Sequence, residues 1–356
     1  MRKSRGMTWG ALLVLVLCSA CAQVEYYAQA AHGQFSLLAA RRNIDVWLED
    51  PSADASLKQK LESVLKIREF AVRELGLPDN GSYRAYADLQ RPYVLWNVAA
   101  AGELTLKPEQ WCFPVAGCVN YRGYYQREMA QKFADRLRVK GFDVQMAGVP
   151  AYSTLGWFDD PVLSTFIHYP EGELARLIFH ELAHQVVYVR NDTKFNESFA
   201  VAVEEAGVAR WLELEGTERM RAAYAAHRAR KRDFLDLLLT HRARLAAIYD
   251  SPAPREEKLR TKALVFKDLQ DDYRLLKQEW GGYAGYDRWF AEPLSNAHLA
   301  MVALYHDYVP GFHALLEREG SFEGFYRAVR ALGKLDPPTR QAFLQQAGSG
   351  EHVASQ

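Results

Sequence analysis

The five residues His180-Glu181-Leu182-Ala183-His184 constrain the fold of this chain more than any other feature of its sequence. They lie between Gly172 and Val189, where apolar residues recur at helical spacing and predict a buried helix. On such a helix the two imidazoles project from one face about 6 Å apart along the axis, so they can bind one ion. This arrangement suits tetrahedral zinc, and Glu181 in this motif acts as a general base on water at the metal.

A catalytic zinc site needs a third protein ligand and an open fourth position. The segment Asn196-Glu197-Ser198-Phe199-Ala200 predicts the start of a second helix that extends to Leu214, and Glu197 would stand in its first turn. We therefore predict that His180, His184 and Glu197 bind Zn2+. Glu204 and Glu205, two turns further on, are the alternative third ligands. The competing interpretation of Glu197 is a carboxylate that only stabilises the positive end of its helix.

Periodicity along the chain predicts an α+β fold that is mostly α-helical. Helices are expected over residues 23–49, 56–75, 124–139, 172–189, 197–214 and 296–344, with two long antiparallel helices within 218–280. Strands are expected within 82–122 and over 142–146 and 162–167. We expect a single domain over 21–347, with a sheet-containing half to about residue 170, a helical half from residue 171, and a disordered tail over 348–356.

The first 20 residues predict an export signal, because three basic residues near the start precede the apolar run Met7 to Leu17. This run of 11 residues is too short to span a bilayer as a helix. Ser19-Ala20 before Cys21 resembles a bacterial lipobox, although Cys18 stands where that pattern usually has Leu. We expect a lipid anchor at Cys21 and a location on the periplasmic side of the outer membrane, since Ala22 rather than Asp follows. An ordinary cleaved signal is the alternative.

Two cysteines, Cys112 and Cys118, remain after the signal. In an oxidising compartment they can form a disulfide that closes a short loop, and two buried free thiols are the alternative. The 44 basic residues balance the 44 acidic ones, so no net positive field predicts a nucleic-acid partner.

Asn196, Glu197 and Ala200 resemble the Asn-Glu-x-x-Ala pattern of the gluzincin metallopeptidases, although the spacing from His184 is shorter than in the best-known branches. More of the chain is similar to the bacterial lipoproteins described as predicted aminopeptidases. The similarity lies in residues 115–124, 156–161, 180–200 and 296–312. The resemblance implies a zincin-like fold with a small sheet before the motif helix, and a zinc exopeptidase that acts on peptides.

Several further residues are candidates for substrate binding. Tyr121, Arg122 and Tyr124 form a polar and aromatic cluster suited to a peptide terminus, and Tyr305 is a candidate oxyanion donor. Aromatic packing is the alternative interpretation of each. The acidic residues that suit a free α-amino group are Asp159, Asp160 and Glu205.

The stretch Tyr152 to Thr165 is expected to form an edge strand that pairs with bound peptide. Two other functions stay open, a zinc endopeptidase and a non-enzymatic envelope lipoprotein with a structural zinc or a binding role. The presence of Glu181 argues against the second, because a structural site needs no base beside its metal.

Overall fold

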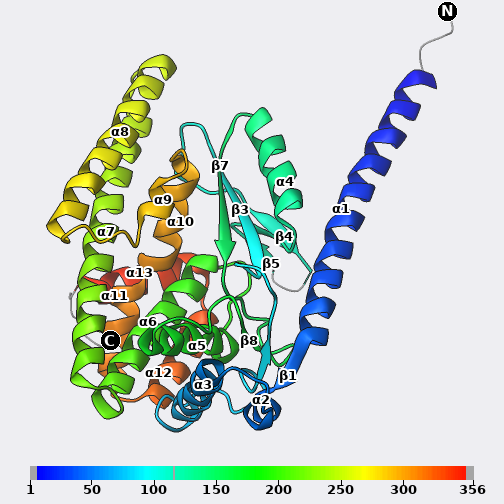
Figure 1. Cartoon of the computed structure of the whole chain (residues 1–356). Helices are drawn as coiled ribbons and strands as arrows, with labels where there is room; N and C mark the ends of the chain where they lie inside the picture. The colour runs from blue at the N-terminus through cyan, green and yellow to red at the C-terminus, as the bar shows by residue number, and fades with distance from the viewer. Residues whose placement is uncertain (1–5, 115–116, 350–356) are drawn as a thin grey trace, which may run out of the picture.

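The computed structural model describes residues 6–114 and 117–349 and shows an α+β fold in which helices predominate (Figure 1). The helices of the first half are α1 (Gly6–Ala40), α2 (Ile44–Glu49), α3 (Ala55–Arg73) and α4 (Arg127–Val139). The strands are β1 (Arg41–Asn43), β2 (Ala85–Ala87), β3 (Leu95–Gly102), β4 (Trp111–Phe113), β5 (Gly117–Val119), β6 (Arg122–Tyr124), β7 (Phe142–Val149) and β8 (Val162–Leu163). The helices of the second half are α5 (Glu171–Val186), α6 (Thr193–Leu214), α7 (Glu218–Asp250), α8 (Arg255–Glu279), α9 (Asp287–Phe290), α10 (Asn296–His306), α11 (Val309–Glu319), α12 (Phe322–Gly333) and α13 (Pro337–Gly348).

Three small sheets lie in the first half of the chain. Strand β3 is the centre of an antiparallel sheet with the order β6-β3-β7, and α4 covers one face of it. The buried residues between them include Val98, Ala134 and Val144. Strands β1, β2 and β8 form the second sheet, and β4 pairs with β5 in a hairpin. The predicted small sheet before the motif helix is therefore present, divided into three parts.

The motif helix α5 packs directly against α6 in the main core. Gly207 on α6 permits the close approach, because an added Cβ atom would lie 2.8 Å from the Phe179 ring and 2.7 Å from Leu75. Phe179 itself is fully buried, and such burial contributes about 1.5–3 kcal/mol. Helices α3, α10 and α11 pack around this pair. The core thus holds the helix that carries both histidines rigidly.

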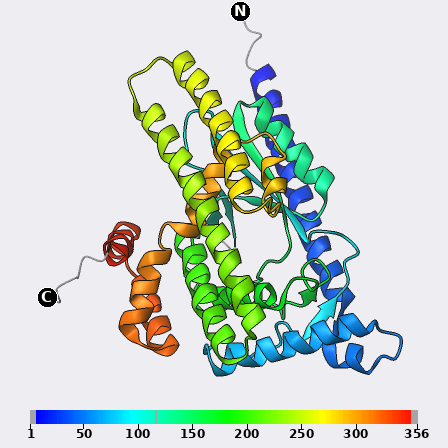
Figure 2. The same ribbon diagram turned by 60° about the vertical axis from the view of Figure 1, so that its left-hand side comes forward.

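Helices α7 and α8 form the predicted antiparallel hairpin, which stands on the side of the molecule opposite α1 (Figure 1). Figure 2 shows the two helices running alongside each other for most of their length. Their facing residues, such as Leu238, Leu245 and Leu269, form a separate core that α10 joins through Leu299. Residues from this hairpin and from α10 therefore lie beside α5 and α6.

Two helix boundaries differ from the sequence prediction for reasons that the structure shows. The helix expected over residues 23–49 ends at Ala40, because β1 pairs with β2 and the Asn43 side chain caps a new helix. Helix α6 begins at Thr193, four residues before Glu197, because the Asp192 carboxylate caps it by accepting a hydrogen bond from the Phe195 amide. Glu197 consequently stands in the second turn of α6.

The edge strand expected over residues 152–165 is also different. Regular pairing is confined to the two residues of β8, which pair with β2 in parallel, and a turn follows at Phe166. Residues 152–161 form a loop instead, in which Thr154 binds the Asp160 carboxylate. Residues 1–5 of the predicted signal and 350–356 of the predicted tail lie outside the described residues, and α13 continues to Gly348. Within the part of the chain that the structure describes, no helix combines the length and apolar character needed to cross a membrane.

Candidate metal centre and active-site cleft

His180, His184 and Glu197 come together in the structure as the sequence predicts. One donor atom from each lies within 4.8 Å of the other two, and no other group of this kind occurs among the described residues. The two histidines stand one turn apart on α5, and Glu197 faces them from α6. The packing of α5 against α6 therefore brings the three side chains together.

The distances in this group fit a zinc ion. The Nε2 atoms of His180 and His184 lie 3.4 Å and 3.7 Å from the Glu197 Oε2 atom. Tetrahedral zinc with bonds of 2.0–2.1 Å separates its ligands by about 3.3 Å. Two imidazoles with one carboxylate are the donor set of several catalytic zinc sites. The residues present thus fit a zinc ion with an open coordination position.

Glu204, predicted as an alternative ligand, has a different place. Its Oε2 atom lies 2.9 Å from the Nδ1 atom of His180, on the side of the ring away from Glu197. Arg176 donates to the same oxygen at 3.0 Å, and Lys231 contacts the other oxygen at 3.4 Å. Glu204 therefore positions His180 and does not face the metal centre. The sequence signal is its spacing, since seven residues after Glu197 is two turns along the same helix face.

The connection between α5 and α6 is held by Asn196. Its side-chain oxygen accepts a hydrogen bond from the Val189 amide at 2.7 Å, and its side-chain nitrogen donates to the Val189 carbonyl at 2.8 Å. Asp192 also pairs with Arg340 of α13 at 2.7 Å. These bonds hold the connection between the two helices that brings Glu197 opposite the histidines. Asn196 therefore has a structural role, whereas its neighbour Glu197 faces the metal centre.

Two carboxylates, Glu197 and Glu204, contact the two ring nitrogens of His180. Burial alone would lower the pKa of His180, but hydrogen bonds to Glu197 and Glu204 outweigh it and raise that pKa to about 10. Burial would raise the pKa of Glu197, but His184 and His180 outweigh it and lower that pKa to about 2. A field that favours a proton on His180 this strongly also favours a metal cation in its place.

Glu181 is buried beside the ligands and points to the same cleft. Burial raises its pKa, and the carboxylates of Glu197 and Glu204 add to this effect, while His180 and His184 oppose it. A carboxylate that accepts a proton more readily than an ordinary Glu suits a group that takes a proton from water and later returns it.

A cleft of about 590 Å³ opens over the ligand group. His180, Glu181, His184 and Glu197 form its floor, and β3, β6 and the segment after β7 contribute one wall. Two other predicted residues, Tyr121 and Tyr305, line it as well. Burial raises the pKa of both phenols, so each keeps its proton and can donate a hydrogen bond. Tyr26 from α1 also lines the cleft, and nothing in the sequence pattern indicated this.

The other predicted binding residues lie elsewhere. Arg122 and Tyr124 line a neighbouring hollow, where the Arg122 guanidinium lies 3.8 Å from the centre of the Tyr26 ring. Asp159 is exposed, and Asp160 is buried behind the loop that it stabilises. Glu205 pairs with His313 at 3.0 Å. Of the single side chains predicted to act on the substrate, Tyr121 and Tyr305 line the cleft. Tyr152, Ser153 and Leu155, from the stretch that was expected to pair with peptide, line it as well.

The β4–β5 hairpin covers one side of this cleft. A disulfide joins Cys112 to Cys118 within it, and the neighbouring Phe113 and Val119 line the cleft. The Cys118 amide donates to the Asn191 side chain at 2.8 Å. The hairpin is thereby tied to the connection between α5 and α6, and so to the ligand group.

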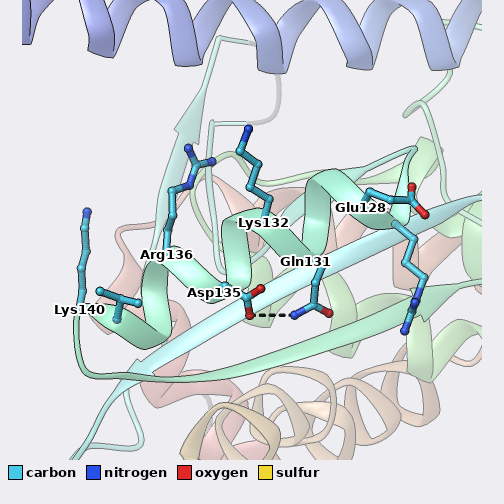
Figure 3. A pocket seen from close by; sticks show the side chains of 8 residues that line it. Glu128, Gln131, Lys132, Asp135, Arg136 and Lys140 are labelled. Atoms are coloured by element: carbon cyan, nitrogen blue, oxygen red, sulfur yellow. Dashed lines mark hydrogen bonds between the residues drawn. The ribbon is translucent and has the colours of Figure 1, made fainter.

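A larger hollow of about 740 Å³ lies over α4, but size does not mark the functional site here (Figure 3). Seven of its eight lining residues belong to α4 and the eighth, Lys140, follows it directly, and most of them are charged. Figure 3 shows Lys132 and Arg136 pointing to the side where α1 runs. None of the three predicted zinc ligands lines it, so it offers no partner for the chemistry of the cleft.

Comparison with known proteins gives one match. A family model described as "Putative aminopeptidase" matches residues 25–344, which is most of the chain and includes the ligand group and the whole cleft. Neither the curated proteins nor the solved structures contain a match. Since the family model covers the fold and the site together, the chain belongs to the family described as "Putative aminopeptidase".

Proposed function

We propose that this protein is a zinc-dependent peptidase with a zincin-like fold of the gluzincin type, and that it removes residues from the amino terminus of peptides. The observation that carries the proposal is the placement of Glu181 between two histidines that share a centre with Glu197 on the floor of a cleft. Membership of the aminopeptidase family supports peptides as the substrate class.

The residues of the site have distinct roles in this reaction. His180, His184 and Glu197 would hold the zinc, which when bound supplies a Lewis acid that polarises the scissile carbonyl and acidifies water. Glu181 takes the proton from the attacking water and passes it to the leaving amine. Tyr305, whose phenol stays protonated, is the candidate donor to the developing oxyanion. Tyr121 lines the same cleft and is a candidate for holding the peptide.

A zinc endopeptidase is the second candidate, and one observation favours it. An aminopeptidase needs a carboxylate for the substrate ammonium group. Glu181, Glu197 and Glu204, the described carboxylates that line the cleft, already serve as base, ligand and partner of His180. Asp159, Asp160 and Glu205 do not line it. A peptide without a terminus in the cleft needs no such partner.

We also propose export and lipid anchoring. The sequence over residues 1–20 supports a signal peptide, and Cys21 is the proposed acylated residue. The protein would then lie on the periplasmic side of the outer membrane. Acyl labelling of the full-length chain, compared with its Cys21→Ser variant, tests this, and equal labelling of both would remove the anchor from the proposal.

Glu181→Gln is the test of the peptidase function. The variant keeps the size of the side chain but removes the base, so zinc content and thermal stability should persist while turnover falls by a factor on the order of 100 to 10,000. Hydrolysis of a mixed peptide library, followed by mass spectrometry, gives the readout. If wild-type protein loaded with zinc cleaves no peptide, or the variant cleaves equally well, the proposed chemistry is wrong and a structural or binding role takes its place.

A further inference from the structure

A second pocket of about 380 Å³ adjoins the active-site cleft. The two share Arg176, Lys231, Tyr305 and His306 in their walls, so they lie next to each other. Arg176 lies one turn before His180 on α5, a separation of about 6 Å along the helix axis. An extended peptide covers about 3.3–3.6 Å per residue. If the scissile peptide bond lies at the ligand group, a substrate residue within about two positions of that bond therefore reaches the mouth of the second pocket.

One part of the wall of the second pocket is apolar. It comes from α7, from α9 with the residue before it, and from α10, and comprises Phe234, Leu235, Tyr286, Trp289, Met301 and Val302. The other lining residues are Tyr305 and the polar or charged residues Gln145, Glu173, Arg176, His227, Lys231, His298 and His306. The Phe234 and Tyr286 rings stack with their centres 4.0 Å apart, and the Trp289 ring stands perpendicular to Phe234 at 5.5 Å. Rings packed against one another form a preformed surface that suits a large flat or branched apolar group.

Some of the polar groups around the pocket already have partners. Glu173 accepts a hydrogen bond from Arg176 at 2.8 Å, and Arg176 also donates to Glu204 at 3.0 Å. The Nδ1 atom of His298 accepts a hydrogen bond from the Ser295 amide at 3.2 Å. A charged ligand side chain would have to break these contacts to gain its own, whereas an apolar one leaves them intact.

We propose that this pocket is a substrate subsite that takes a large apolar side chain, aromatic or branched aliphatic, within two residues of the scissile bond. The inference rests on the proposed peptidase function and adds to it the class of substrate. The hairpin of α7 and α8 then has a functional part, since α7 supplies both Phe234 and Leu235 to the subsite.

The test is cleavage profiling of the zinc-loaded full chain with a peptide library that varies every position around the cleaved bond. The wild-type protein should enrich Phe, Leu, Met or Trp at one fixed position. Leu235→Trp on α7 and Met301→Trp on α10 fill the pocket from different helices. Each should lower kcat/KM about tenfold or more for a peptide with the large residue, and change it less than about twofold for its alanine counterpart.

The matched control is Leu264→Trp on α8, where the original side chain is 59% exposed and lies outside the pocket. It should keep the wild-type profile. Two filling variants are used so that the test can still be made if one of them does not fold. Zinc content and thermal unfolding show which variants are folded. Cleavage without enrichment at any position, or an unchanged profile in a folded filling variant, would overturn the subsite. A complete lack of zinc-dependent cleavage in wild type would instead overturn the proposed function itself.

Discussion

The Nδ1 atom of His180 lies 2.9 Å from the Glu204 Oε2 atom, and the same oxygen accepts a hydrogen bond from Arg176 at 3.0 Å. Burial would raise the pKa of Glu204, but Arg176, His180 and Lys231 hold it well below its usual range. The carboxylate is therefore charged and accepts a hydrogen bond from the Nδ1–H group of His180. Where a metal ion replaces the proton on Nε2, this hydrogen bond would keep the remaining proton on Nδ1 and leave the Nε2 lone pair for the metal.

The first prediction is that Glu204→Gln weakens zinc binding about 10- to 100-fold, although Glu204 is not a ligand. An amide is a poorer acceptor for the Nδ1 proton than a carboxylate and makes His180 a weaker ligand. Competition with a chelator measures the affinity. Glu205→Gln is the matched control, because its carboxylate pairs with His313 and does not line the cleft. Equal affinities for the two variants would show that the contact with His180 has no influence on the metal.

The second prediction separates ligand from base. Glu197→Gln removes a carboxylate ligand and the charge that balances the cation, so zinc content after dialysis should fall well below one per chain. Added zinc should restore part of its activity, whereas no zinc concentration restores Glu181→Gln. If Glu197→Gln retains zinc as tightly as wild type, the third ligand is misassigned.

The sequence predicted the motif helix, the ligand group and the helical hairpin, because each depends on local periodicity or on spacing within one pair of helices. The position of Glu197 followed from the helix pattern, even though α6 starts earlier than expected. The contact between α5 and α6 then brings Glu197 next to the two histidines. Helical periodicity and spacing are sufficient to predict a site whose geometry depends on a single contact between two helices.

The residues that the sequence could not place depend on contacts across long stretches of chain. Tyr26 reaches the cleft only because α1 packs along β6. Arg122 lies two residues before Tyr124 on β6, yet both occupy the hollow beside α4 and not the cleft that Tyr121 lines. Lys231 comes to Glu204 from α7, 27 residues further along the chain. Periodicity gives the face of an element but not the partner that covers it.

The third prediction is that Cys112 and Cys118 are joined in protein isolated from an oxidising compartment, as the structure joins them. Mass spectrometry without reduction should find the intact pair and no alkylated thiol. Replacing both with Ser should lower the free energy of unfolding by about 2 kcal/mol, because closing so short a loop restricts the unfolded chain modestly. Two freely alkylated thiols in the native protein would contradict the pairing.

The fourth prediction concerns Asp160, which is buried and accepts a hydrogen bond from the Thr154 amide at 2.9 Å. Burial raises the pKa of Asp160 to about 7, the Thr154 hydrogen bonds partly oppose this, and Glu181 and Asp159 add to it. The unfolded chain has a carboxyl pKa near 3.9. Between these two values the folded protein binds more protons than the unfolded chain. The contribution of Asp160 to stability is therefore fully present below about pH 4 and is lost as the pH rises to about 7.

Asp160→Asn removes this loss, because the amide oxygen still accepts the Thr154 hydrogen bond and carries no charge to bury. The variant should gain stability relative to wild type as the pH rises, by at most about 4 kcal/mol at pH 8 and by much less at pH 5. Urea unfolding at the two pH values, with saturating zinc in every sample, measures the difference. Asp159→Asn, at the exposed neighbouring position, is the control and should show little change with pH. An Asp160→Asn effect that is the same at pH 5 and pH 8 would mean that this carboxyl group is already charged in the folded protein at the lower pH.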